Sequence, residues 1–206
     1  MLAVTFFGTL INLEKGIFIG IILSLVFYLY RTSRPLIRSV APDPNTLKRK
    51  FVQVATANLQ ECPQLKMLRV YGSIFFGAVD HVKQTLHGVQ EENPQQKHTL
   101  IFSNGINFSD IAGAEMLVQE AKRHRKLGGN LYLCGVKEGF CGTLRQGGYL
   151  DQIGRENLYP TKSAAIEGIY PQLDSDVCRI CTARIFNECG ERLPNGEGRT
   201  MKNGKA

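Results

Sequence analysis

The stretch HTLIFSNGINFSDIAGAEMLVQEAKRHRKL, residues 98–127, decides the fold of this chain because a strand pattern in it leads directly into a helix pattern. His98 to Ser103 is an apolar run bounded by polar residues, which predicts a central strand covered on both faces. Asp110 to Leu127 predicts a helix whose apolar side is formed by Ile111, Ala114, Met116, Leu117, Val118 and Ala121. Basic residues in its last turns suit the negative end of the helix dipole, and Gly128-Gly129 ends it.

The same alternation continues on both sides of this stretch. Lys66 to Tyr71 predicts a strand and Ala78 to Val89 an amphipathic helix, while Asn130 to Cys134 predicts a strand and Thr161 to Tyr170 a helix capped by Thr161. Shorter elements are predicted at Phe51 to Ala55 (strand), Ser73 to Phe76 (strand or bulged continuation) and Phe140 to Leu144 (helix). Alternation over about 110 residues predicts an α/β fold, a sheet covered by helices.

Residues 1–30 have the pattern of membrane segments. Met1 to Ile11 and Ile17 to Tyr30 are uncharged apolar stretches, separated by the polar interruption Asn12 to Gly16. As a helix the second stretch would span about 21 Å, less than the roughly 30 Å of a bilayer's hydrocarbon core. We therefore predict a short transmembrane helical hairpin, or the end of one membrane helix followed by another short one, buried by neighbouring helices.

A signal peptide and a buried hairpin of a soluble protein are the alternatives. A signal peptide would need a basic residue before the apolar run and small residues at a cleavage site after it, and neither is present. A soluble helix would have a polar face, whereas Ile17 to Tyr30 is apolar all round. Arg31, Arg34 and Arg38 follow the apolar stretch, so the positive-inside rule places residues 31–206 in the cytoplasm.

The net charge of +7 is concentrated in one short segment. Six basic residues and one acid between Arg31 and Lys50 give a local charge of +5, and since Glu14 and Lys15 cancel, only +2 remains for residues 51–206. A nearly neutral body excludes a general nucleic-acid-binding domain. The same segment contains Pro42 and Pro44 and no apolar period, so residues 31–50 are predicted to be a basic juxtamembrane linker before a domain at 51–172.

Three stretches together resemble the C-terminal end of the sulfate permease (SulP) family of anion transporters, whose last membrane helices lead into a cytoplasmic STAS domain. Leu13 to Gly20, followed by Ser24, resembles the final membrane turn and helix of that family. Arg69 to Ala78 resembles its R-x-x-G-x-x-F-F-x-A segment, and Asn107 to Gly113 resembles the D-x-[ST]-G loop before a STAS helix. The resemblance covers residues 1 to about 172 and implies a STAS domain preceded by a remnant of a membrane domain.

The resemblance assigns a regulatory or interaction loop to Ser109, Asp110, Ile111, Ala112 and Gly113. In STAS domains that act as anti-sigma-factor antagonists, the residue after the loop aspartate is a phosphorylated serine or threonine. Ile111 and Ala112 have no hydroxyl group, so this phosphoswitch is absent from its usual position. Ser109 is either a phosphosite or, as the favoured interpretation, a loop or N-cap residue, and Asp110 equally suits a helix N-terminus. We expect this loop to be the interaction surface.

No nucleophile, base and orienting group can be assembled from the sequence, so we predict that the chain is not an enzyme. His81 and His87 are not stacked on one helix face, and His124 is predicted to lie on a solvated face among basic residues. Gly128-Gly129 and Gly147-Gly148 lack the Lys-Ser/Thr of a phosphate-binding loop.

Residues 173–206 are predicted to form a cysteine-containing, partly disordered tail that ends in the polar stretch Pro194 to Ala206. Cys178-x-x-Cys181 spacing lets two thiolates reach one metal ion such as Zn²⁺, and Cys189 is a candidate third ligand, with no obvious fourth. A metal site, a redox site and reduced cysteines in a mobile extension all stay open. Cys62, Cys134 and Cys141 are interpreted as structural thiols.

These observations predict the regulatory and interaction STAS domain of a SulP-type transporter. The resemblance implies that the parent moves sulfate, bicarbonate or a related anion, with a coupled cation, across an inner or plasma membrane. One or two membrane segments cannot form such a pore alone. The expected partners are the membrane, the remaining transporter membrane domain, a second copy in a homodimer and a cytoplasmic protein. The alternatives are a stand-alone membrane-tethered STAS module that recruits a soluble partner and a cysteine-based metal or redox sensor.

Overall fold

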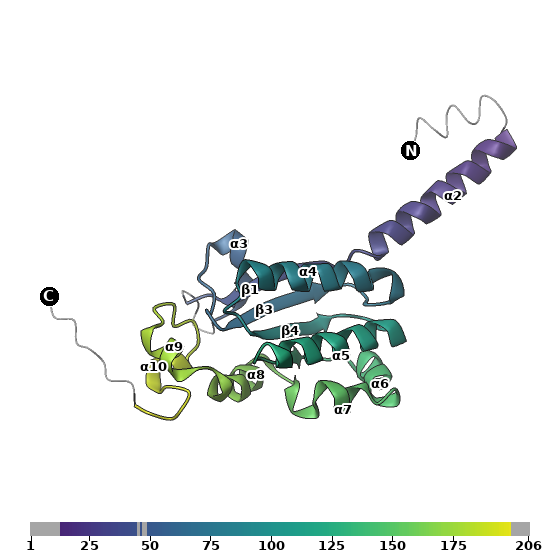
Figure 1. Cartoon of the computed structure of the whole chain (residues 1–206). Coiled ribbons are helices and arrows are strands. Elements are labelled where there is room, and N and C mark those ends of the chain that lie inside the picture. Colours follow the sequence, from purple (N-terminus) through teal and green to yellow (C-terminus); the bar gives the residue numbers. More distant parts are fainter. Residues whose placement is uncertain (1–12, 45, 47–48, 199–206) are drawn as a thin grey trace.

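The computed structural model of the chain describes residues 13–44, 46 and 49–198, and its centre is a six-stranded sheet (Figure 1). The strands lie in the order β2-β1-β3-β4-β5-β6, with the bounds β1 Leu36–Pro42, β2 Phe51–Gln53, β3 Leu65–Tyr71, β4 His98–Gly105, β5 Leu131–Cys134 and β6 Leu158–Tyr159. β1 runs antiparallel to β2 and β3, whereas β3, β4, β5 and β6 run parallel. The predicted α/β fold is confirmed, since helices connect the parallel strands.

Helices cover both faces of the sheet. One face packs against α4 (Val79–Glu92), α5 (Ile111–Lys126), α6 (Glu138–Gln146) and α7 (Tyr149–Ile153), and the other against α8 (Lys162–Ile169) and the residues after it. β4 serves both cores, because Ile101 belongs to the first and Leu100 and Phe102 belong to the second. The prediction of a central strand covered on both faces is therefore confirmed. The shorter helices are α3 (Val54–Ala57), η1 (Phe76–Ala78), η2 (Arg155–Asn157), η3 (Tyr170–Gln172), α9 (Ser175–Ile180) and α10 (Glu188–Glu191).

The apolar stretch before the sheet forms one helix, α2 (Leu13–Thr32), which extends away from the body of the molecule (Figure 1). Its large apolar side chains from Ile17 to Tyr30 are exposed, except for the half-buried Leu23. Among the described residues it is the one helix long and apolar enough to cross a membrane. Leu13 to Gly16, predicted as part of a polar turn, is the first turn of this helix, so that part of the prediction is wrong. The predicted first segment, Met1 to Ile11, lies outside the described residues.

The predicted linker is wrong at residues 36–42, which form β1 inside the sheet. Leu36 to Ser39 pair with β3, and Val40 to Pro42 pair with β2. Pro42 is tolerated because its part of β1 has a single neighbouring strand, so no hydrogen bond toward β3 needs its missing N–H. The connection between α2 and the sheet therefore shrinks to residues 33–35.

Two short predicted strands are also corrected. The strand predicted at Phe51 to Ala55 ends at Gln53, because α3 begins at Val54. Ser73 to Phe76 is not a strand: Ile74 makes a single bridge to Ser109, and Phe76 starts the 3₁₀ turn η1. The apolar residues of this segment divide between inside and outside, because Ile74 is fully buried while Phe76 is 81% exposed.

The predicted tail packs as part of the fold over residues 173–198, the part of it that the structure describes. Ile185, Phe186 and Leu193 are buried in the core beneath α8. Tyr170 donates a hydrogen bond from its hydroxyl to the Arg192 carbonyl oxygen at 2.6 Å. Residues 194–198 form a turn closed by a bridge between Arg192 and Gly198, so the disorder predicted from residue 194 is wrong for these five residues. The rest of that stretch, 199–206, lies outside the described residues.

Candidate functional site

The loop from Ser109 to Gly113 lies where β4 passes into α5, next to the turn that follows β3. Asp110 is the N-cap of α5, and its Oδ1 accepts a hydrogen bond from the Gly113 backbone N–H at 2.9 Å. Its Oδ2 accepts a second from the Phe76 backbone N–H, also at 2.9 Å. One carboxylate therefore caps the helix and joins the two loops at this edge of the sheet. An acid was expected at this helix N-terminus, but the N-cap role considered for Ser109 belongs to Asp110.

Ser109 is completely buried, and its hydroxyl donates to the Asp110 carbonyl oxygen at 3.3 Å. Gly113 lies against it, since a Cβ at that position would meet the Ile74 carbonyl oxygen and lie 2.6 Å from the Ser109 hydroxyl. A phosphate on Ser109 would have to displace this packing. The geometry favours the loop role for Ser109, and Ile111, the exposed residue at the usual phosphorylation position, has no hydroxyl group.

A shallow groove runs beside the loop on the helical side. Its lining includes Phe76 and Val79 on the one hand and Ala112, Met116 and Gln119 of α5 on the other. The groove separates the starts of α4 and α5, so both loops of the candidate site contribute to one surface.

A buried polar network lies at the opposite end of α5, and the sequence did not indicate it. His124 is only 1% exposed, so its predicted place on a solvated face is wrong. Its Nδ1 lies 2.8 Å from the Glu120 carbonyl oxygen and its Nε2 lies 2.9 Å from the Thr99 hydroxyl of β4. Burial lowers the pKa of His124. The buried Glu120 carboxylate lies 2.9 Å from His87 Nε2 and 3.5 Å from Arg123.

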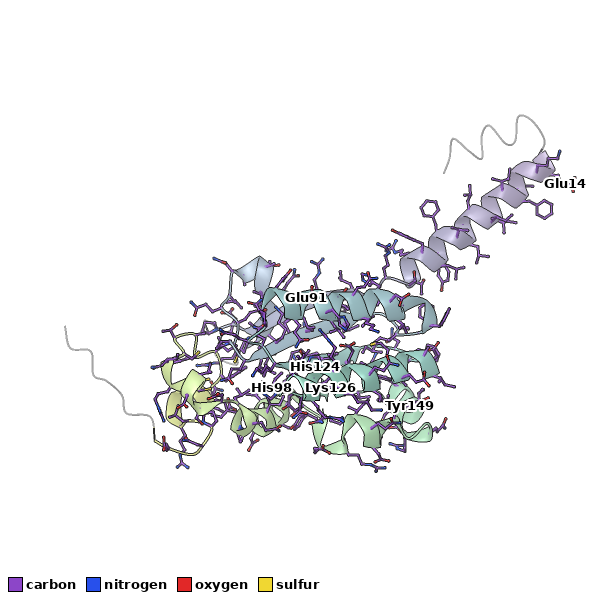
Figure 2. All side chains as sticks on the ribbon, in the orientation of Figure 1. Glu14, Glu91, His98, His124, Lys126 and Tyr149 are labelled. Carbon is purple, nitrogen blue, oxygen red and sulfur yellow. The ribbon has the colours of Figure 1, made fainter. Side chains whose placement is uncertain are left out.

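His98, which Figure 2 labels within the body of the molecule, lies at the start of β4 and belongs to a second buried chain of hydrogen bonds. The Tyr132 hydroxyl donates to Gln172 Oε1 at 2.8 Å, so its oxygen is left to accept from His98 Nδ1 at 3.1 Å. Burial, with smaller contributions from nearby His124 and Lys97, lowers the pKa of His98 to about 4. His98 and His124 are therefore neutral groups, which join β4 to β5 and β4 to α5 respectively. The hydrogen bonds of these two histidines involve no serine or cysteine.

The three tail cysteines, Cys178, Cys181 and Cys189, lie near a fourth cysteine that the sequence analysis did not group with them. Cys62, just before β3, lines a small apolar cavity together with Cys178, Cys181 and Cys189. Burial, with smaller contributions from the nearby Cys189 and Cys178, raises the pKa of Cys62 to about 12. No disulfide bond joins any of the six cysteines, all of which lie within the described residues. Because Cys62 lies far from the other three in sequence, spacing could not have indicated it.

Gln64 connects the cysteine segment to the start of β3. Its side-chain N–H donates to the Asp174 carbonyl oxygen at 2.9 Å and to Cys178 Sγ at 3.3 Å, and its Oε1 accepts from the Asp174 backbone N–H at 2.7 Å. Within residues 13–44, 46 and 49–198, no three His, Cys, Asp or Glu side chains are arranged to hold a metal ion. The four thiols thus share a cavity without the geometry of a finished metal site.

The fold and the loop identify the class of the protein. The family model of the STAS domain matches residues 56–165, which is more than half of the chain. The chain belongs to the STAS domain family, and it is homologous to sulfate transporters of the SulP/SLC26 group.

Two curated relatives show the transporter homology. The chain is 25% identical over 183 residues to Sulfate transporter 1.2 of Arabidopsis thaliana, covering 84% of this chain. It is 25% identical over 161 residues to YvdB of Bacillus subtilis (strain 168), a candidate sulfate transporter, covering 77% of this chain. The chain spans only 28% of the length of each relative.

A solved structure of a transporter has the same fold. The murine Slc26a9 anion transporter in the inward-facing state superposes with a TM-score of 0.71 at 18% sequence identity. The match covers 80% of this chain and 27% of the transporter. At this identity the likeness concerns the fold.

Proposed function

We propose that this chain is the cytoplasmic regulatory and interaction domain of a SulP-type secondary anion transporter. The observation that carries the proposal is the direct joining of an exposed apolar helix, α2, to a STAS sheet through three residues, 33–35. The homology to sulfate transporters supports sulfate, or an anion like it, as the parent's substrate. The STAS body itself would act through contacts, not through catalysis.

Transport would need the remaining membrane domain. The chain corresponds to little more than a quarter of each transporter relative, and one candidate span lies within its described residues. A secondary transporter places its anion site between several membrane helices, so α2 alone cannot form that site. The chain would therefore contribute regulation, assembly with a second copy, or contact with a cytoplasmic protein.

An immunoblot of native membranes tests this proposal. Antiserum raised against residues 66–172 is expected to detect a membrane-bound band several times larger than the 23.0 kDa of this chain. A single membrane-bound band at that mass would contradict the transporter proposal. It would favour the alternative, a membrane-tethered STAS module that recruits a soluble partner.

A second candidate function is favoured by the cavity that Cys62, Cys178, Cys181 and Cys189 share. Four thiolates are the ligand set of a structural zinc site, and a cluster of thiols is also a redox site, so the tail would act as a metal or redox sensor. Zinc binding would require the thiols to rotate toward one centre. Metal analysis of the purified chain tests the zinc form: about one ion per chain supports it, and a stoichiometry near zero with titratable thiols contradicts it.

A further inference from the structure

The exposed large apolar side chains outside α2 are not spread evenly over the described surface. They are Leu36, Tyr71, Phe76, Phe108, Ile111, Leu127 and Ile180. The first five lie at one edge of the sheet: Leu36 opens β1 and pairs with Tyr71 at the end of β3, and the other three belong to the loops that follow β3 and β4. Leu127 and Ile180 lie toward the other end, after α5 and in α9.

Three of these side chains form the most exposed part, which we call the apolar edge: Phe76, Phe108 and Ile111. They are 81%, 54% and 65% exposed. The two loops that carry them are fastened together, since the Ile74 N–H donates to the Phe108 carbonyl oxygen at 3.0 Å and the Phe76 N–H donates to Asp110. Hydrogen bonds therefore hold the two loops of the apolar edge together, and large apolar side chains grouped and exposed in this way indicate a contact surface.

The position of α2 determines what this surface can reach. Only residues 33–35 separate Thr32, the last residue of α2, from Leu36. An extended chain covers at most about 3.6 Å per residue, so Leu36 lies no more than about 14 Å from the end of α2. The link is also ordered: the Ser33 N–H donates to the Leu29 carbonyl oxygen, and Pro35 packs against Gly72 in the turn after β3. Figure 1 shows α2 leaving the body at this end.

The charges around the link suit an anionic bilayer surface. Arg31 and Arg34 follow the apolar part of α2, and the Arg34 guanidinium lies 4.5 Å from the centre of the Tyr30 ring. Basic and aromatic residues are the groups that favour the headgroup layer. Asp80 and Glu115 line the groove beside Phe76, and the Asp110 carboxylate accepts the Phe76 N–H between the two loops. Because these acids disfavour deep insertion, the expected contact is shallow and confined to Phe76, Phe108 and Ile111.

We propose that the apolar edge rests on the lipid–water interface of the membrane that α2 spans, so that the STAS interaction loop faces lipid rather than a soluble partner. The inference rests on the proposed function, because it needs α2 to be inserted. The short link keeps the apolar edge close to the bilayer, which gives the edge a high effective concentration at the membrane surface. A contact of low intrinsic affinity is therefore enough to keep the edge bound. The bilayer would then fix the orientation of the STAS body.

The absence of tryptophan from the chain allows a direct test. Single tryptophans are introduced into the full chain as Phe76→Trp, Phe108→Trp, Leu25→Trp and Ile180→Trp, and each protein is reconstituted into nanodiscs of phosphatidylcholine and phosphatidylserine, with or without brominated acyl chains. Leu25 lies in α2 and reports insertion. Ile180 is 80% exposed at the far end of the body and serves as the matched control.

We expect bromine to quench Leu25→Trp, Phe76→Trp and Phe108→Trp, the last two with a blue-shifted emission, and to leave Ile180→Trp unchanged. Quenching at Leu25→Trp without quenching at Phe76→Trp and Phe108→Trp would overturn this inference and leave the proposed function standing. A blue shift at position 76 without quenching would overturn it in favour of a protein contact. No quenching at Leu25→Trp would overturn the insertion of α2, and the inference with it.

Discussion

At the scale of single residues, Ser109 decides whether the STAS loop can carry a phosphoswitch. Its side chain is fully buried against Gly113 and Ile74. Ser109→Asp would bury a charge without a partner, so we expect the free energy of unfolding to fall by about 3 kcal/mol or more. Ser109→Ala loses one hydrogen bond and is expected to cost about 1 kcal/mol. Urea unfolding of the full chain in detergent compares the two, and equal stability of both variants would contradict the structural role.

His98 provides a residue-scale prediction about pH. Its pKa is about 4 in the folded state because it is buried, against an ordinary value of 6.5. The unfolded chain therefore binds the proton more readily, so this contribution to stability is complete above pH 6.5 and is lost as the pH falls toward 4. Between pH 7 and pH 5 we expect a loss of roughly 2 kcal/mol.

The variant His98→Gln isolates that contribution. A glutamine N–H can still donate to the Tyr132 hydroxyl oxygen but does not titrate in this range. The unfolding free energy of the wild-type chain should therefore fall more steeply from pH 7 to pH 5 than that of His98→Gln. Parallel pH profiles would show that His98 is not buried as a neutral group.

At the scale of elements, the irregular segment after α8 is expected to stabilise the fold by burying apolar side chains in the core, as the strands and helices do. Phe186 is 3% exposed beneath α8, so Phe186→Ala should reduce the free energy of unfolding by about 3 kcal/mol or more. Ile180→Ala is the matched control, because Ile180 is exposed and should change stability by less than about 0.5 kcal/mol. Similar effects of both substitutions in thermal unfolding would mean that the segment does not pack as described.

The elements that the sequence predicted are those with a clear period or a continuous apolar run. β3, β4, α4 and α5 satisfy this condition, and their bounds were predicted to within a few residues. β1 was missed because Pro42, with Pro44 just after the strand, suggested a linker. The packing of Phe186 was missed because the apolar residues after α8 follow no period. Both depend on contacts with distant parts of the chain, which local patterns do not contain.

For the candidate site, too, the sequence predicted local features and missed those that depend on contacts between distant segments. The resemblance located the loop, and the helix dipole explained why an acid such as Asp110 lies at the N-terminus of α5. The burial of Ser109 and His124, and the approach of Cys62 to the tail cysteines, arise only when distant segments pack together. Sequence patterns thus located the loop but could not show which of its side chains are exposed.

At the scale of the whole molecule, one physical constraint relates α2, the STAS body and the interaction loop. The link of residues 33–35 is too short to let the body turn freely, so the side of the membrane on which residue 33 emerges fixes the side on which the sheet folds. Arg31 and Arg34 lie at this point, so the positive-inside rule predicts that the body lies on the cytoplasmic side if α2 spans the membrane as proposed.

Protease protection tests this topology. In inside-out membrane vesicles, added protease is expected to destroy the epitope within residues 66–172, whereas in intact spheroplasts the epitope should survive. The double variant Arg31→Glu and Arg34→Glu removes the charges that orient α2 while leaving the sheet and both cores unchanged, since both residues precede β1. It should therefore expose part of the epitope to protease in spheroplasts. Complete digestion of the wild-type epitope in intact spheroplasts would place the STAS body outside the cytoplasm, and the apolar edge would then face the opposite leaflet.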